Sequence, residues 1–459
     1  MRLFLFFVFC FALEASAQVL TPEQFIQQVR LYHPLAKQAT LEVEKAKAEL
    51  LSVRGNFDPA LTFQGGSKTF DGKNYYSYAN PEVKVPTRLA GLDLKAGLEN
   101  NGGQFLNSEN TAGQSSYLGF VLPVGKGLIT DQRRTALQQA LIYRSMSEQE
   151  KRRMVNDLLF DAYVGYWQWA GAYQLYSIYS NFLRVSTDRL RLVRLSFQQG
   201  DRSAIDTLEA LTQVQNFEML QADAAVKLNT SSLELSNFLW DENDSAYALS
   251  PKTLPDTTQF ALYQPVRPLN DVMEQAMLEN PTLRSYDYKL DALEAEKRLK
   301  FQSMLPVVNL KANLLNQGYN VFKDFGGALF QNNYLWGIDV KFPLFIREGR
   351  GDYQKAKLKI QETNYQLNAK RWETQNKVRN YYTETALLQK QIRLTQQAFT
   401  GFSSLLKAEN LRFQNGESSL FLVNTRENKV IETAEKLINL RVKYLKANYA
   451  VDWAAGLLR

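Results

Sequence analysis

The chain of 459 residues contains a single cysteine and a single histidine. Cys10 lies in an apolar N-terminal segment, and no later cysteine exists for a disulfide, a thiolate metal site or a thiol nucleophile. His33 precedes a proline and has no second imidazole and no carboxylate cluster at ligand spacing. We therefore predict that the chain binds no metal or cofactor and that His33 has a structural role.

Catalytic motifs are also lacking. The sequence has no Gly-x-Ser-x-Gly nucleophile elbow and no His-Glu-x-x-His zinc motif. Residues 119–127 have some likeness to a phosphate-binding loop, but the glycines are too far apart and Lys126 is followed by glycine instead of Ser or Thr. This segment is better interpreted as a bend between a strand and a helix. We predict that the protein is not an enzyme.

Long apolar runs are confined to the first residues. Arg2, the apolar run after it and the small residues Ala15-Ser16-Ala17 are typical of a signal peptide, and we predict cleavage after residue 17. No later run reaches the roughly 18 apolar residues that a membrane-spanning helix needs. An exported chain without such a helix is periplasmic, secreted or a β-barrel of the outer membrane.

The excess of basic residues is modest and dispersed. Lys and Arg number 54 against 47 Asp and Glu, which gives a net charge of +7 and a pI near 9.1. The basic residues are scattered among acidic ones and form no dense block, so we expect no nucleic-acid partner.

Two similar stretches, Leu195–Glu209 and Leu411–Glu427, each contain a glycine followed three positions later by a serine. A glycine just past a helical run favours a left-handed helix end, and the serine can cap the helix that follows. We therefore predict two tips of helical hairpins. They contain Gly200, Asp201 and Ser203 in the first stretch and Gly416, Glu417 and Ser419 in the second.

The residues around the tips predict a duplicated plan. The prolines Pro34 and Pro59 are 25 residues apart, as are Pro281 and Pro306. Pro123 precedes Gly200 by 77 residues, while Pro343 precedes Gly416 by 73. We predict a first repeat at 18–240, with strands at about 57–125 and a tip near 200. A connector at 241–267 follows, and then a second repeat at 268–459, with strands at about 305–345 and a tip near 416.

The first long helical segment begins after Thr130 and has coiled-coil spacing. Apolar and small residues recur at alternating steps of four and three from Leu158 to Phe197. A segment of this length is about 100 Å long at 1.5 Å per residue, far longer than an ordinary globular helix.

The strand regions alternate apolar with polar or small residues, as in a lipid-facing β-barrel wall. A soluble sandwich gives the same alternation, but the signal peptide, the segment length and the aromatic residues near the turns favour the membrane wall. A further hairpin turning between Pro86 and Gly91 would give six strands, and the sequence leaves four or six open. The residues predicted to face lipid are Leu118, Phe120, Leu122, Leu310, Leu314, Trp336, Ile338, Val340 and Phe342.

With these features in order, the chain resembles the TolC family of outer-membrane efflux proteins. The resemblance rests on Phe57-Asp58-Pro59 before the first strand, on the segments 123–127 and 343–351 after the strands, on both tips, and on the final segment 448–458. It implies an α+β membrane protein: a homotrimer whose strands form one transmembrane β-barrel, continued by a long periplasmic α-helical coiled-coil barrel. The implied location is the outer membrane of a Gram-negative bacterium, in contact with its lipid.

The resemblance also implies partners and site residues. The tips would contact a periplasmic adaptor, also called a membrane fusion protein, attached to an inner-membrane pump. Members of the family tend to have an apolar residue after each tip glycine, where this chain has Asp201 and Glu417. They often have an aspartate about six residues after the second tip glycine. Here that position is Leu422, and its equivalent in the first repeat is Asp206.

The acidic tip residues have two interpretations. Asp201 and Glu417 are expected either to stabilise the first turn of the following helix or, with Asp206, to form a negatively charged periplasmic aperture.

The predicted function is the exit duct of a tripartite efflux system that conducts small toxic compounds passively to the exterior. The alternatives are the duct of a type I polypeptide secretion system and, from another class, a periplasmic coiled-coil scaffold or adaptor.

Overall fold

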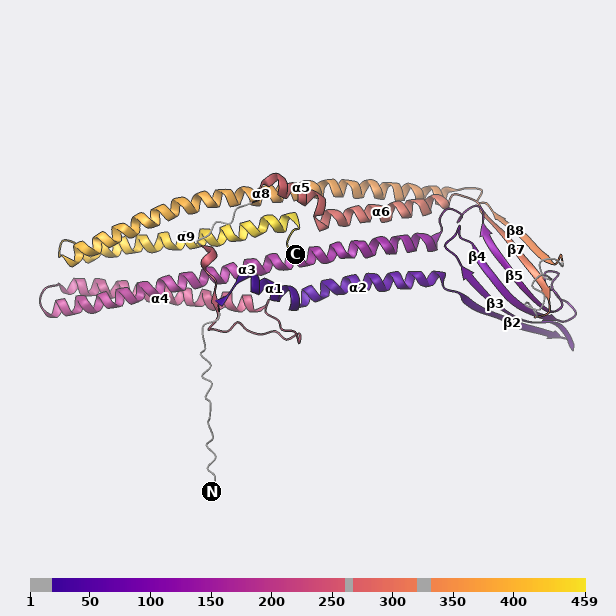
Figure 1. Cartoon of the computed structure of the whole chain (residues 1–459), viewed down its shortest axis with the longest axis horizontal. Helices are drawn as coiled ribbons and strands as arrows, with labels where there is room; N and C mark the ends of the chain where they lie inside the picture. Colours follow the sequence, from indigo (N-terminus) through magenta and orange to yellow (C-terminus); the bar gives the residue numbers. More distant parts are fainter. Residues whose placement is uncertain (1–18, 261–266, 320–331) are drawn as a thin grey trace, which may run out of the picture. The chain divides into compact units, whose positions relative to one another are not determined.

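A computed structural model describes residues 19–260, 267–319 and 332–459 (Figure 1). The predicted signal peptide therefore lies outside the described residues, as does part of the predicted connector. Across these three ranges, no helix is both long and apolar enough to cross a membrane.

The chain divides into two compact units that each combine segments far apart in sequence. The first unit comprises Met1–Thr40, Arg152–Asn280 and Trp372–Arg459, and the second comprises Leu41–Lys151 and Pro281–Arg371. Three of the boundaries between the units fall inside helices, so the division follows packing and not the order of the chain.

The first unit is helical. Within it, α3 (Gln132–Gln198) and α4 (Ala204–Ser236) form one hairpin, and α8 (Arg347–Gln414) and α9 (Leu420–Ala455) form another (Figure 1). The unit also contains α1 (Pro22–Tyr32) and α5 (Leu269–Glu279). It includes α3 from residue 152 onward and α8 from residue 372 onward.

Local sequence explains where α1 begins and ends. Thr21 caps it, since its hydroxyl accepts from the Gln24 amide at 3.2 Å while the Gln24 side chain accepts from the Thr21 amide. Pro22 occupies the first helical position. The helix ends before His33-Pro34, and α2 (Pro34–Arg54) begins at the proline.

The predicted seam of α3 provides the core of the helical unit. Most of its members are buried, including Leu158, Trp169 and Val193, whereas Phe197 near the tip is exposed. Leu158 and Trp169 belong to one core cluster with Phe25 of α1, Tyr166 and Trp167 of α3, and Leu445 of α9. Tyr166 also donates from its hydroxyl to the Leu20 carbonyl at 2.7 Å. The short parallel pair of β1 (Val19–Leu20) and β6 (Leu254–Pro255) adjoins this core.

The second unit contains one antiparallel sheet of six strands in sequence order. The strands are β2 (Ala60–Phe70), β3 (Lys73–Pro86), β4 (Asp93–Gly102), β5 (Gly113–Pro123), β7 (Val307–Gln317) and β8 (Tyr334–Lys341). β3 and β4 are joined at the turn between Pro86 and Gly91, so of the two strand counts that the sequence leaves open the described residues have six. The first strand begins at Ala60, directly after Phe57-Asp58-Pro59, and Phe57 itself belongs to a short 3-10 helix, η1 (Gly55–Phe57).

Candidate functional site

One face of the sheet is apolar across all six strands. The register pairs Leu118 with Leu314, and Leu122 with Leu310, which in turn pairs with Ile338. Residues that pair directly on neighbouring strands point to the same face. The predicted lipid-facing residues of β5, β7 and β8 therefore share one face. Phe342 is the exception, since it lies one residue beyond β8.

The apolar face continues onto the first three strands. Leu94 pairs with Phe120, Val83 pairs with Ala96, and Leu61 pairs with Val83. Several of these side chains are exposed, with Trp336 at 66%. A contiguous exposed apolar face of this kind is unfavourable in water and is typical of a surface that contacts lipid or protein.

The opposite face carries paired charges. Lys95 lies 3.2 Å from Glu82, and the Tyr117 hydroxyl donates to the same carboxylate at 2.6 Å. Asp93 accepts from Lys84 at 3.0 Å and from Arg133 of α3 at 2.9 Å. One face is therefore suited to apolar surroundings and the other to water.

The edges of the sheet, β2 and β8, have no strand beside them within the described residues. Their unpaired N–H and C=O groups can pair with strands of another chain. Six strands are also too few to enclose a lumen, because a barrel of about eight strands is already filled by its side chains.

Both hairpin tips end their first helix in the same way. At the first tip, the Gly200 amide donates to the Phe197 carbonyl at 3.0 Å and the Asp201 amide donates to Ser196 at 2.9 Å. At the second, Gly416 donates to Phe413 and Glu417 donates to Arg412, at 3.1 and 2.8 Å. This pair of bonds is the Schellman motif, and both glycines have the positive φ that it requires, 83° and 78°.

The two predicted serines cap the second helices. Ser203 is the N-cap of α4, and its hydroxyl accepts from the Asp206 amide at 3.3 Å. The Asp206 carboxylate in turn accepts a hydrogen bond from the Ser203 amide at 3.1 Å and another from the Ser203 hydroxyl at 2.9 Å. Ser419 caps α9 by accepting from the Leu422 amide at 3.4 Å.

These bonds correct the expectation for the two acids that follow the glycines. Asp201 and Glu417 lie two residues before the N-caps, in the turn itself, so the interpretation that places them in the first helical turn is wrong. Asp206 is the carboxylate that stabilises the start of α4. The side chains of Asp201 and Glu417 are exposed to solvent.

A buried ion pair behind the tips was not predicted from the sequence. Arg189 of α3 donates to both carboxylate oxygens of Glu427 on α9, at 2.8 and 2.9 Å, and to Asn424 at 3.3 Å. Asn424 donates to Glu209 of α4 at 3.3 Å. The side chain of Glu427 is 1% exposed and that of Arg189 is 12% exposed. This cluster joins the two hairpins through hydrogen bonds.

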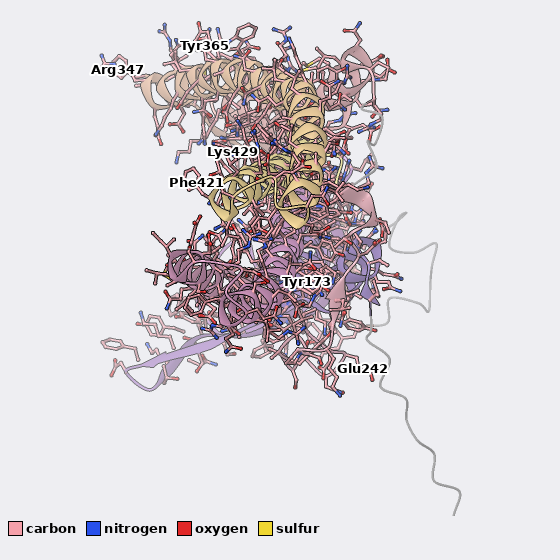
Figure 2. The ribbon with its side chains drawn as sticks, turned by 90° about the vertical axis from the view of Figure 1, so that its left-hand side faces the viewer. Tyr173, Glu242, Arg347, Tyr365, Phe421 and Lys429 are labelled. Atoms are coloured by element: carbon pink, nitrogen blue, oxygen red, sulfur yellow. The ribbon has the colours of Figure 1, made fainter. Side chains whose placement is uncertain are left out.

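Apolar side chains are also exposed at the tips. Phe421 is 64% exposed, and Ile205 on the other hairpin is exposed as well. In Figure 2 the Phe421 side chain lies outside the α9 ribbon. A groove of about 390 Å³ separates the ends of α3 and α8, and in it the Arg202 guanidinium lies 4.3 Å from the centre of the Phe413 ring. The tips thus combine exposed carboxylates with exposed apolar side chains.

His33 is packed among aromatic rings. Its Nδ1 accepts from the Leu35 amide at 3.2 Å, and its ring lies 5.9 Å from that of Phe238. Burial lowers the pKa of His33 below its usual value. In the described ranges, no group of three or more His, Cys, Asp or Glu side chains could hold a metal ion.

The described residues thus combine a sheet that has one apolar face and one charged face with long helical hairpins. A family profile described as Outer membrane efflux protein matches residues 272–457. The predicted resemblance to the TolC family of outer-membrane efflux proteins is confirmed, as is the predicted location in the outer membrane with a periplasmic extension. Channels of this kind are not enzymes, as predicted.

Solved structures with the same fold include the CmeC outer membrane channel of Campylobacter jejuni. It is 13% identical, with a TM-score of 0.65, and the match covers 95% of this chain and 86% of that one. The outer membrane protein VceC of Vibrio cholerae is 15% identical, with a TM-score of 0.64 and coverage of 95% and 96%. The open state of the MtrE channel of Neisseria gonorrhoeae is 12% identical, with a TM-score of 0.63 and coverage of 95% and 89%. A search of curated protein sequences finds no match.

Proposed function

We propose that the protein is the outer-membrane exit duct of a tripartite efflux system and conducts small toxic compounds, such as drugs or metals, from the periplasm to the exterior. The observation that carries this proposal is the six-stranded sheet with one apolar face, one charged face and two open edges. Its apolar face contacts outer-membrane lipid, and its charged face lines an aqueous channel.

The working assembly is a homotrimer. Three chains with six strands each supply 3 × 6 = 18 strands, and barrels of about 16–18 strands leave an aqueous channel. The edges β8 and β2 of neighbouring chains close the wall. The helical hairpins of the three chains form the periplasmic coiled-coil barrel, and transport through this duct is passive.

The lengths of the helices support an internal duplication. The helices α1 and α5 both have 11 residues, and α2 and α6 (Pro281–Gln302) have 21 and 22. The long helices α3 and α8 have 67 and 68. The first repeat contributes four strands to the sheet and the second contributes two.

The tips are the proposed contact with the periplasmic adaptor, which in turn joins the inner-membrane pump. Three chains bring six tips together, and the exposed Asp201 and Glu417 give this end a negative potential that favours cations. Asp206 adds its charge to the same end, while the hydrogen bonds from Ser203 hold its carboxylate at the start of α4. Opening of the duct requires the tips to move outward.

Cysteine crosslinking tests the proposal. Cys10 is the only cysteine of the chain, so pairs of cysteines placed on β2 and β8 report contacts between these edges without interference. We expect oxidation of cells to give a ladder that ends at the trimer in the outer-membrane fraction. A matched pair on β4 and on β8, which are not neighbours in the sheet, should give none. Monomer alone from every β2 and β8 pair would refute the proposal.

A further inference from the structure

A groove of about 420 Å³ lies in the second unit, where the strands pass into the helices. The start of α3, the end of α6 and the start of α8 form its walls. It is separate from the tips and from the charged face of the sheet, and the proposed function gives it no role.

The groove is basic. Lys297 and Arg298 of α6 line it together with Arg134 of α3. Arg134 is already bonded, because its guanidinium donates to the carbonyls of the preceding loop and to Asp131. Lys297 pairs with Glu294 one turn earlier on α6, a partly exposed pair of the kind that is worth less than about 1 kcal/mol and can be exchanged for a phosphate. Arg298 is exposed and makes no ion pair with any residue that the structure describes, so its charge is available to an anionic ligand.

The wall of the groove also contains a buried acceptor without a donor. The side chain of Gln302 is 3% exposed, and its Oε1 has no hydrogen-bond partner. Leaving such a group unpaired costs about 1–3 kcal/mol. A ligand with an N–H or O–H group next to its phosphate would satisfy this oxygen.

Aromatic and apolar side chains complete the site. Phe301 and Tyr353 line the groove, with their ring centres 5.8 Å apart. Ile129 in the connection after β5 and Phe345 in the connection after β8 are exposed at the same end of the sheet. Basic groups beside exposed apolar ones are the composition of a protein surface at the boundary between lipid and water.

We propose that this groove binds the headgroup of phosphatidylethanolamine from the periplasmic leaflet of the outer membrane. Lys297 and Arg298 bind the phosphate, and the ammonium group donates to Gln302 Oε1 beside the rings of Phe301 and Tyr353, which attract a cation. The inference rests on the proposed function, because the groove meets lipid only if the sheet is the membrane wall.

Native mass spectrometry of the full-length protein in detergent tests this site. The probes are phosphatidylethanolamine, phosphatidylcholine, whose headgroup has no N–H donor, and inorganic phosphate alone. We expect phosphatidylethanolamine to bind about tenfold more tightly than phosphatidylcholine, since a hydrogen bond from a charged group contributes roughly that factor. Inorganic phosphate should not displace it at equal concentration.

Two variants separate the contacts. The variant Lys297→Gln with Arg298→Gln should bind both lipids about tenfold more weakly, whereas Gln302→Leu should lose only the preference for phosphatidylethanolamine. Arg144→Gln, on the exposed surface of α3 outside the groove, is the control for a lost positive charge and should bind as the wild type does.

Equal binding of both lipids to the wild type, unchanged binding to the double variant, or full displacement by phosphate would each overturn the proposal. The crosslinking test of the trimer distinguishes failure of the lipid site from failure of the proposed function. If β2 and β8 crosslink and the lipid test fails, only the headgroup site is refuted.

Discussion

The ion pair of Arg189 and Glu427 should contribute strongly to the packing of the two hairpins against each other. Replacing Arg189 with Met leaves the carboxylate of Glu427, 1% exposed, without its cation. Removing one partner of a buried pair costs about 3–5 kcal/mol, whereas replacing both partners with apolar residues is often neutral or stabilising. Arg189→Met and Glu427→Leu should therefore each destabilise the tip region, and the double variant should recover most of the loss.

Hydrogen exchange followed by mass spectrometry measures this effect locally, which avoids the assumption of two-state unfolding in a large assembly. A loss of about 3 kcal/mol raises the opening of the amides in the first turns of α9 about 100-fold, because each 1.4 kcal/mol is a factor of ten. The matched control is Arg191→Met, also on α3. Its 3.6 Å pair with Asp188 is exposed and is worth less than about 1 kcal/mol.

Two results would refute this reasoning. One is a single variant at Arg189 or Glu427 that exchanges like Arg191→Met. The other is a double variant whose loss equals the sum of the two single losses, which would mean that the two side chains do not interact.

Three further predictions concern the tips and the buried histidine. Gly200→Ala should destabilise the first tip by about 1–2 kcal/mol through backbone strain alone, since φ is 83° and no heavy atom beyond the adjoining residues lies within 4 Å of the added methyl group. A variant with unchanged hydrogen exchange around residue 200 would contradict this. Asp201→Asn with Glu417→Gln should reduce the preference for cations in single-channel recordings, and unchanged selectivity would refute a carboxylate ring. The pKa of His33 is lower in the folded chain than its unfolded value of 6.5, so its contribution to stability is complete above pH 6.5 and is lost as the pH falls below it. Urea unfolding between pH 7.5 and 5.5 should therefore show a smaller pH dependence in His33→Phe than in the wild type, and an identical dependence would count against this role.

Features with a local cause could be predicted from the sequence. A Schellman motif needs a residue with positive φ and an N-cap needs a short hydroxyl side chain, so Gly200 and Ser203 identify their tip without knowledge of the rest of the fold. The apolar face of the sheet could be predicted for the same reason, because strand alternation alone determines which side chains share a face.

Features that depend on distant parts of the chain could not be predicted. Arg189 and Glu427 are 238 residues apart, and each is one of many charged residues on helices of similar pattern. The carboxylate that caps α4 illustrates a smaller error of the same kind. Asp201 and Asp206 both follow Gly200 closely, and only the position of the first helical residue, Ala204, decides which of them reaches the cap.

The direction of the strands determines how the proposed wall can close. Successive strands of the sheet alternate in direction, and the even number of six leaves β2 and β8 antiparallel to each other. The β8 edge of one chain can then pair with the β2 edge of the next in the same antiparallel manner as inside the sheet. Such a contact uses different surfaces on the two partners, so it closes only when chains are arranged in a ring. Because the ring removes every open edge while each chain keeps its apolar face outward, the same geometry that makes the single chain unsuited to water makes the assembled ring suited to a membrane.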